Sequence, residues 1–443
     1  MQRKFYALPL LFTILITFTA CGGGTTEYDK KHYSGKIKGS EVGHFIDSAV
    51  EGLEYTRQTG TTSLTNRNGT FYYKLGETVN FKIGNLDLGT TFGLSTTTPK
   101  DIVSFDEREL NTSIYAPAVN NRVRMLMSLD EDDNPNNGIF ISETIREDAR
   151  FWSTPDYDLN SSEFDNSFAA ATNKTITVPK DVAEQHFAAS LRCSYSGAYR
   201  GYQILPNGAE GPLVGVMIQA YDKNISKSTS PIIALSDGQD LNNNGVHDQF
   251  LYALGNHNMD TGSYKFDTTY QFDKDAGRII GSPLQNVTGD GISLGYNKVE
   301  GAFRQGGNAG AYVTFRVGEG NNTAYRYTGY GLDNNTTNDD NVSIDPILGL
   351  FSFDVDINGH IYGLIHDART NLEPELNGNV DFVTGITEIH LTLNGNNYLL
   401  TGIIPVNTNT LSNTVHLRWQ DSNGKKLGYI DGVGCQLRSQ SLN

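Results

Sequence analysis

The stretch FSFDVDINGHIYGLI, residues 351–365, decides the fold of the C-terminal half of the chain. Apolar and polar residues alternate on both sides of Asn358-Gly359, and Asn-Gly supplies the positive φ angles that a tight hairpin turn needs. The stretch TEIHLTLNGNNYLL, residues 387–400, repeats this arrangement around a second Asn-Gly pair. Because short turns join such strands, we predict that residues 193–443 form an antiparallel β meander, either a barrel or a pair of sheets.

The composition of the chain is typical of a turn-rich β protein outside the cytoplasm. Its 443 residues include 47 glycines and 23 tyrosines, and only 19% of them are charged. The formal net charge is −16, and no basic stripe interrupts the acidic surplus. We therefore expect no nucleic-acid partner, because the neutralisation of phosphates supplies much of that affinity.

Residues 1–20 have the anatomy of a bacterial signal peptide. Arg3 and Lys4 precede an apolar run, and FTAC follows at residues 18–21. This string resembles the lipobox of bacterial lipoproteins. The resemblance implies that the thiol of Cys21 accepts diacylglycerol, that palmitate is also attached, and that these lipids anchor the chain to the membrane. Gly22 implies, by the same resemblance, sorting to the outer membrane, on its periplasmic or its cell-surface face. The alternative is an ordinary secretory signal with an incidental cysteine.

The number of cysteines carries a second expectation. The chain has three, and acylation of Cys21 leaves Cys193 and Cys435 as a pair in an oxidising compartment. We predict that these two form a disulfide, which closes a loop of about 240 residues and contributes about 4–5 kcal/mol in the chain-entropy model. Two buried free thiols are the alternative.

Residues 44–97 have the most regular strand pattern in the N-terminal part. VNFKI at residues 79–83 alternates apolar and polar, and NGTFYY at residues 68–73 enters a strand from an Asn-Gly turn. The string over residues 45–89 is similar to the carboxypeptidase-regulatory and Cna-B-like β-sandwich module of bacterial surface lipoproteins. The resemblance implies a small N-terminal β-sandwich that serves as a stalk or spacer, with no chemistry to carry over.

Residues 98–192 change to a helical pattern. Val123, Leu126 and Met127 share a helical face, and further helices are expected at 162–171 and 179–191. The string NRVRMLMSLDEDDNPNNGI from residue 121 resembles the segment that follows the β module in proteobacterial-type lipoproteins. We therefore expect a mainly β chain with five parts, which are a signal peptide (1–20), a flexible tether (21–43), a β-sandwich (44–97), a short helical spacer (98–192) and a larger antiparallel, barrel-like β domain (193–443).

Two loops rich in Asp and Asn have spacings that suit calcium. DLNNNGVHD, residues 240–248, places oxygen side chains at positions one, three, five and nine and Gly at six. The twelfth position is Leu251, where a bidentate acid is usual. The candidate ligands are Asp240, Asn242, Asn244 and Asp248 in this loop, and Asp130, Asp132 and Asn134 in a weaker cluster at a helix end. The alternative for both is a solvated turn whose side chains cap their own backbone.

Two further patterns give weak signals for catalysis or zinc. GISLG at residues 291–295 matches the nucleophile-elbow string, but a strand is expected after Ser293 where that motif needs a helix. His360 and His366 fall on one face of a strand, yet no third zinc ligand has a suitable spacing. We expect these two histidines, and also His247 and His257, to face solvent.

Tyr325 and Tyr327 share a strand face and form a candidate aromatic platform for a ligand. Cross-strand packing is the alternative.

With no catalytic constellation visible, we expect a non-enzymatic binding, adhesion or structural protein of the cell envelope. Its partners are then the membrane, through the N-terminal lipid, and an unknown protein or glycan. One alternative is an envelope enzyme acting on glycans, whose paired carboxylates meet only in the fold. A second is a structural spacer stiffened by calcium, and we expect no other cofactor.

Overall fold

The structure is a computed structural model that describes residues 40–107, 112–205, 207–220, 229–241, 244, 246, 248–317, 323–333, 347–367, 374–393, 395–407 and 410–437. Cys21, the segment expected to be a signal peptide and most of the expected tether lie outside these residues. The first strand, β1 (Glu41–Phe45), begins inside the segment expected to be tether. The chain is mainly β, as the sequence predicts.

Two small sheets make up the N-terminal part. One has the order β5 (Thr70–Tyr73), β1 and β8 (Thr96–Thr97), and the other has the order β4 (Thr62–Leu64), β3 (Glu54–Arg57), β6 (Thr78–Ile83) and β7 (Leu86–Phe92). The ring centroid of Phe81 on β6 lies 4.8 Å from that of Phe45 and 5.1 Å from that of Phe71. The two sheets therefore share one aromatic core.

Helices follow these sheets and pack back on them. They are α2 (Pro99–Glu107), α3 (Pro117–Ser128), α4 (Glu143–Asp148), the single-turn 3-10 helix η1 (Ala149–Phe151), α5 (Ser161–Thr172) and α6 (Lys180–Tyr195). Arg122 of α3 donates from Nε to the backbone oxygen of Leu88 on β7 at 2.7 Å, and its guanidinium lies 4.1 Å from the centre of the Tyr157 ring. A parallel pair of β2 (Val50–Glu51) and β9 (Ile139–Phe140) adds a backbone link.

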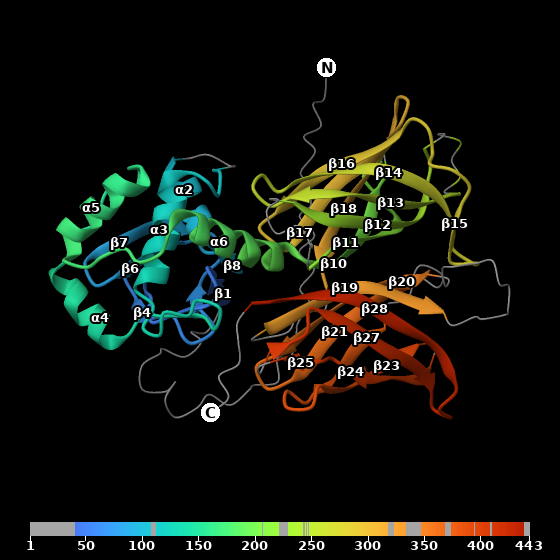
Figure 1. The fold of residues 1–443 in the computed structure, drawn as a ribbon. Coiled ribbons are helices and arrows are strands. Elements are labelled where there is room, and N and C mark those ends of the chain that lie inside the picture. The colour runs from blue at the N-terminus through green and yellow to red at the C-terminus, as the bar shows by residue number, and fades with distance from the viewer. Residues whose placement is uncertain are drawn as a thin grey trace, which may run out of the picture.

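The region after α6 forms two closed antiparallel barrels of eight strands each (Figure 1). The first barrel consists of β10 (Gly197–Ile204), β11 (Glu210–Ile218), β12 (Thr229–Gln239), β13 (Gln249–Asn258), β14 (Ser263–Asp273), β16 (Val287–Leu294), β17 (Lys298–Gln305) and β18 (Asn308–Arg316), with β15 (Arg278–Ile280) attached to β14. The second consists of β19 (Thr323–Asp333), β20 (Ile347–Asp356), β21 (His360–Asp367), β22 (Glu375–Val380), β23 (Ile386–Leu393), β24 (Asn396–Ile403), β27 (Thr414–Asp421) and β28 (Lys426–Gln436), with the small pair β25 (Val406–Asn407) and β26 (Thr410–Leu411) beside it.

The period-two pattern explains why these strands close around a core. In β23 every second residue is buried and every other one is exposed, because successive side chains point to opposite faces of a strand. The prediction of a barrel-like antiparallel region is confirmed, and this region holds two barrels where one domain was expected.

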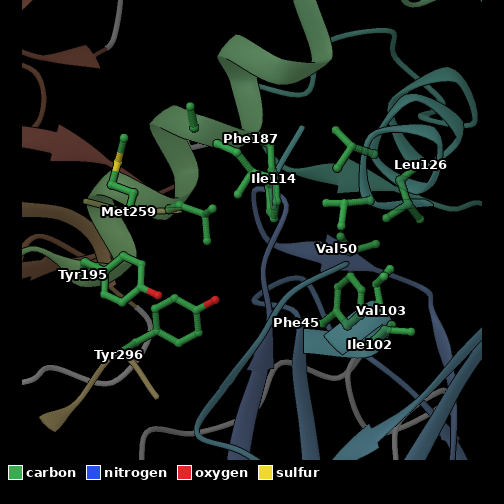
Figure 2. Close-up of a cluster of buried hydrophobic side chains, with 14 of the residues drawn as sticks. Phe45, Val50, Ile102, Val103, Ile114, Leu126, Phe187, Tyr195, Met259 and Tyr296 are labelled. Atoms are coloured by element: carbon green, nitrogen blue, oxygen red, sulfur yellow. The ribbon is translucent and has the colours of Figure 1, made fainter. Parts of the chain in front are cut away.

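One hydrophobic core runs from the N-terminal sheets through the helices into the first barrel. Figure 2 shows part of it, with Phe45 on the side of the sheets, Phe187 and Tyr195 on α6, and Met259 and Tyr296 from the first barrel. The helices of residues 98–192 thus contribute to the same core as the elements on either side of them. The second barrel encloses a core of its own.

The two barrels also touch along their outer faces. Tyr252 of the first barrel and Leu350 of the second belong to one buried apolar cluster, and the hydroxyl oxygens of Tyr252 and Tyr330 are 2.8 Å apart. A Cβ atom on Gly215 would lie 2.4 Å from Cδ2 of His366 in the second barrel. Only glycine allows the imidazole to approach the first barrel this closely.

Candidate functional site

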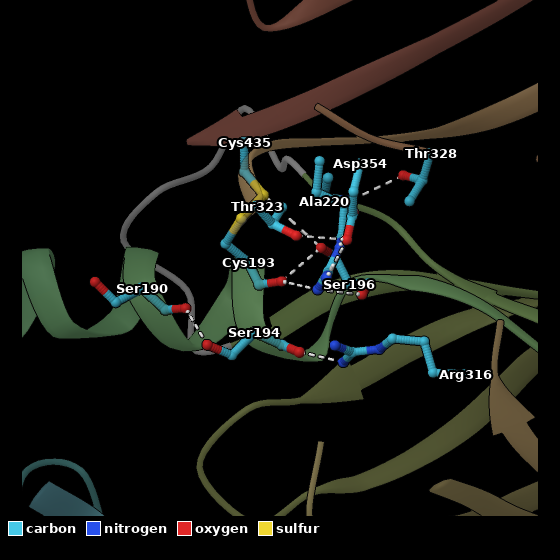
Figure 3. Close-up of a disulfide and its surroundings, with 11 residues drawn as sticks. Ser190, Cys193, Ser194, Ser196, Ala220, Arg316, Thr323, Thr328, Asp354 and Cys435 are labelled. Carbon is cyan, nitrogen blue, oxygen red and sulfur yellow. Dashed lines mark hydrogen bonds and ion pairs between the residues drawn. A yellow bond between two sulfur atoms is a disulfide. The ribbon is translucent and has the colours of Figure 1, made fainter. Parts of the chain in front are cut away.

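The C-terminal end of α6 is the point where the helical segment and both barrels meet. Cys193 in the last turn of α6 is bonded to Cys435 on β28, the last strand of the second barrel, with Cα atoms 5.7 Å apart (Figure 3). The disulfide predicted from the sequence is confirmed. We call this region, from Arg192 to Ser196 with its partners, the helix-end junction.

A buried ion pair of the second barrel lies beside the disulfide. Arg326 on β19 binds Asp354 on β20 through two parallel contacts, Nε to Oδ1 at 2.7 Å and Nη2 to Oδ2 at 2.9 Å. Both side chains are almost fully buried, with 3% and 2% exposed. Thr323 donates to Oδ2 of Asp354 at 2.8 Å. A two-pronged contact of this kind fixes the orientation of both groups as well as their distance.

The same arginine binds the end of α6. Nη1 of Arg326 donates to the backbone oxygens of Cys193 at 3.1 Å and Ser196 at 3.2 Å. From the first barrel, the Arg316 guanidinium donates to the backbone oxygen of Ser194. The last carbonyls of a helix have no partner within the helix and carry partial negative charge, so a cation is favourable there. One arginine from each barrel therefore caps α6.

A second polar cluster is buried where the end of α6 and the start of α2 meet turns of the first barrel. Oγ of Ser293 and Nε2 of His257 are 3.0 Å apart, and the His257 side chain is fully buried. Tyr195 packs against the His257 ring at 4.7 Å between centroids. Burial, reinforced by the positive charge of Lys100, lowers the pKa of His257 to about 3.

This serine–histidine pair lacks the features of a hydrolase site. Ser293 lies in β16, and a turn at Gly295 leads directly into β17, so the helix of a nucleophile elbow does not follow. Nδ1 of His257 has no hydrogen-bond partner among the described residues, so nothing there orients the ring as an acid does in a catalytic triad. The pair is also closed off from solvent.

The expectation that His257 and His366 face solvent is wrong. His257 is fully buried and His366 is 2% exposed, because Tyr195 of α6 packs against the first and the seam between the barrels encloses the second. His247 lies outside the described residues. His360, in contrast, keeps half of its side chain exposed beside Asp356. Burial, with a contribution from Arg200, lowers the pKa of His366 to about 4.

These two buried histidines predict a loss of stability in mild acid. Both folded-state pKa values, about 3 and about 4, lie below the ordinary value of 6.5, so the unfolded chain binds protons that the folded chain does not. The stability that the two neutral histidines contribute is complete above about pH 6.5. As the pH drops to 5, the free energy of unfolding falls by roughly 2 kcal/mol for each histidine. Urea unfolding at pH 7 and pH 5 measures the difference.

The control for this prediction is a chain in which both histidines are replaced, His257→Gln with His366→Gln. Its stability is expected to depend less steeply on pH between 7 and 5. Asp130 works in the opposite direction, because burial raises its pKa to about 6. An equal slope in the two chains would show that the histidines are not the cause.

The two candidate calcium loops are only partly described. In the first, the backbone N of Asn244 donates to Oδ1 of Asp240 at 2.9 Å, whereas Asn242 lies outside the described residues. Asp248 is exposed. Among the described residues, no three His, Cys, Asp or Glu side chains gather as a metal site of those residues would need. Two of the four candidate ligands of this loop are asparagine amides, which such a cluster does not include. Calcium binding at this loop therefore stays a prediction.

In the weaker cluster the carboxylates bind the backbone of their own turn. Asp130 accepts the backbone N–H groups of Asn134 at 3.0 Å and Phe140 at 2.8 Å, and Asp132 accepts that of Asn134 at 3.1 Å. This arrangement caps the loop after α3.

Tyr325 and Tyr327 point into the second barrel. They are 2% and 1% exposed, and the Tyr327 ring stacks on Phe353 with centroids 5.1 Å apart. The hydroxyl of Tyr327 donates to the backbone oxygen of Ser412 at 2.8 Å. The two rings are therefore part of the core and present no face to solvent.

Within the described parts of the chain, no helix is both long and apolar enough to cross a membrane. No protein-family model and no curated protein matches the chain.

Proposed function

We propose that the chain is a lipid-anchored protein of the bacterial outer membrane that acts without catalysis, as a binding, adhesion or structural protein. The observation that carries the proposal is the Cys193–Cys435 disulfide. Such bonds persist in oxidising compartments, and pairing these two leaves Cys21 alone after the apolar leader. Cys21 is thus the one cysteine available for acylation.

The body that the anchor would carry supports a binding or structural role. The helix-end junction joins α6 to both barrels through a disulfide, a buried ion pair and two capping arginines. Rigid elements of this kind hold a binding surface in a defined shape, which reduces the entropy lost on association.

The test of the anchor is metabolic labelling with radioactive palmitate in cells that express the full chain. The native chain is expected to take up label and to sediment with membranes, and Cys21→Ala is expected to lose both properties. The matched control, Cys193→Ala with Cys435→Ala, removes the other two cysteines and should still be labelled. Label that persists in Cys21→Ala would contradict the proposal.

A further inference from the structure

An open groove lies between η1 and the C-terminal end of α5, away from the barrels. Its volume is about 490 Å³. Phe151, Trp152, Ala170 and Ala171 supply apolar atoms to its lining, and Asp148 and Lys174 stand at its polar side. None of the residues that the sequence singles out lies in this groove.

Phe151 is the most exposed large apolar side chain among the described residues, with 91% of it accessible to solvent. Backbone hydrogen bonds hold it there, because the N–H of Asn85 donates to the oxygen of Ala149 at 2.9 Å and that of Ser153 to the oxygen of Ala171 at 3.1 Å. The ring is therefore presented by a fixed frame. An aromatic ring so placed is a rigid contact surface that loses little entropy on binding.

The polar side of the groove carries balanced charge. Nζ of Lys174 lies 3.2 Å from Oδ2 of Asp148, and the neighbouring Arg150 and Glu147 form a second pair at 2.8 Å. In a chain with a net charge of −16, this neutral place neither attracts nor repels an ion strongly. Such a surface is complementary to an uncharged ligand.

The available hydrogen-bonding groups distinguish a sugar from a peptide. Ammonium, carboxylate and the exposed Asn173 amide offer donors and acceptors for hydroxyl groups. The backbone oxygen of Ala171 already accepts the N–H group of Ser153, and none of the residues that line the groove lies in a β-strand. An extended peptide, which needs a row of free backbone groups, has no edge to bind.

We propose that this groove binds a neutral oligosaccharide, with Phe151 as the ring on which a sugar stacks and the Asp148–Lys174 pair as its hydrogen-bonding side. The C–H face of a pyranose packs on an aromatic ring, and its hydroxyls meet the polar groups beside it. The inference rests on the proposed binding role and names the class of ligand.

Tryptophan fluorescence tests this proposal directly, because the chain has two tryptophans. Trp152 lines the groove, and Trp419 is buried in the second barrel at 5% exposure. The full chain carrying Trp419→Phe therefore reports from Trp152 alone. Maltohexaose, cellohexaose and hexa-N-acetylchitohexaose are the neutral probes, each titrated to about 5 mM, and a heparin hexasaccharide is the anionic probe.

At least one neutral hexasaccharide is expected to change the emission of Trp152 saturably. Phe151→Ala should weaken its Kd by about tenfold or more, and Phe151→Tyr, which keeps the ring, should restore binding. Phe315→Ala removes another exposed phenylalanine, on the first barrel, and should leave the Kd unchanged. Circular dichroism checks that each variant is folded.

Three outcomes would overturn the proposal. They are no saturable response to any neutral probe, an equal Kd in Phe151→Ala, and tighter binding of the heparin fragment than of every neutral probe. Palmitate labelling of Cys21 is read in a separate experiment, so a failure of sugar binding is distinguishable from a failure of the anchor.

Discussion

Removal of the Cys193–Cys435 disulfide is expected to lower the free energy of unfolding, summed over all transitions of the chain, by about 5 kcal/mol. The two cysteines are 242 positions apart, and a cross-link over so long a loop strongly restricts the unfolded chain. The comparison is between urea unfolding of the oxidised chain, of the same chain in a reducing agent, and of Cys193→Ala with Cys435→Ala.

The reduced chain and the double variant should agree, because both lose the same constraint. Cys21→Ala is the matched control and should unfold as the native chain does. A reduced chain as stable as the oxidised one would contradict the assignment of the disulfide as a main source of stability.

Arg326→Met is expected to destabilise the chain by about 3–5 kcal/mol. The substitution leaves the carboxylate of Asp354 buried without its cation, and it also removes the donor to the backbone oxygens of Cys193 and Ser196. The cost of an uncompensated buried charge exceeds the net value of the pair itself. Urea unfolding measures it.

Two variants separate this effect from a general loss of charge. Arg304→Met breaks the exposed pair with Asp290, whose side chains are 44% and 55% exposed, and should cost about 1 kcal/mol or less. Asp354→Leu added to Arg326→Met removes the unpaired carboxylate and should recover much of the lost stability. Equal effects of Arg304→Met and Arg326→Met would contradict the role given to the buried pair.

Local pattern was enough to predict individual strands and helices. The hairpin read at residues 351–365 is β20 and β21, and the one at 387–400 lies within β23 and β24. The helix expected at 162–171 is α5, and that expected at 179–191 is α6, which runs on to Tyr195. Turn residues and the periods of two and 3.6 are properties of neighbouring residues, so a single sequence carries them.

The number of barrels depends on pairs that are distant in the chain. The first barrel needs β10 beside β18, where Tyr199 pairs with Arg316, and the second needs β19 beside β28, where Arg326 pairs with Cys435. No pattern within one strand specifies such a partner. The short strand β1 and the helix α2 were missed because both are stabilised by packing across the shared core.

The candidate sites show the same division. The disulfide could be predicted from the sequence, because that argument needs only the number of cysteines and an oxidising compartment. The sequence does not show that Arg316 and Arg326 cap the same helix. The one signal for such a role is the charged Arg326 between two aromatic residues in the string YRY at 325–327. The sequence could not decide between an aromatic platform and packing for Tyr325 and Tyr327, because alternation defines two faces of a strand without saying which is inside.

Differential scanning calorimetry of the oxidised chain most directly tests whether the helix-end junction makes α6 and the two barrels one unit. A single cooperative transition is expected, with equal calorimetric and van't Hoff enthalpies. In Cys193→Ala with Cys435→Ala, the second barrel should unfold in a separate transition at lower temperature, because it encloses its own core. Two separate transitions already present in the oxidised chain, and unchanged by the substitutions, would contradict the account.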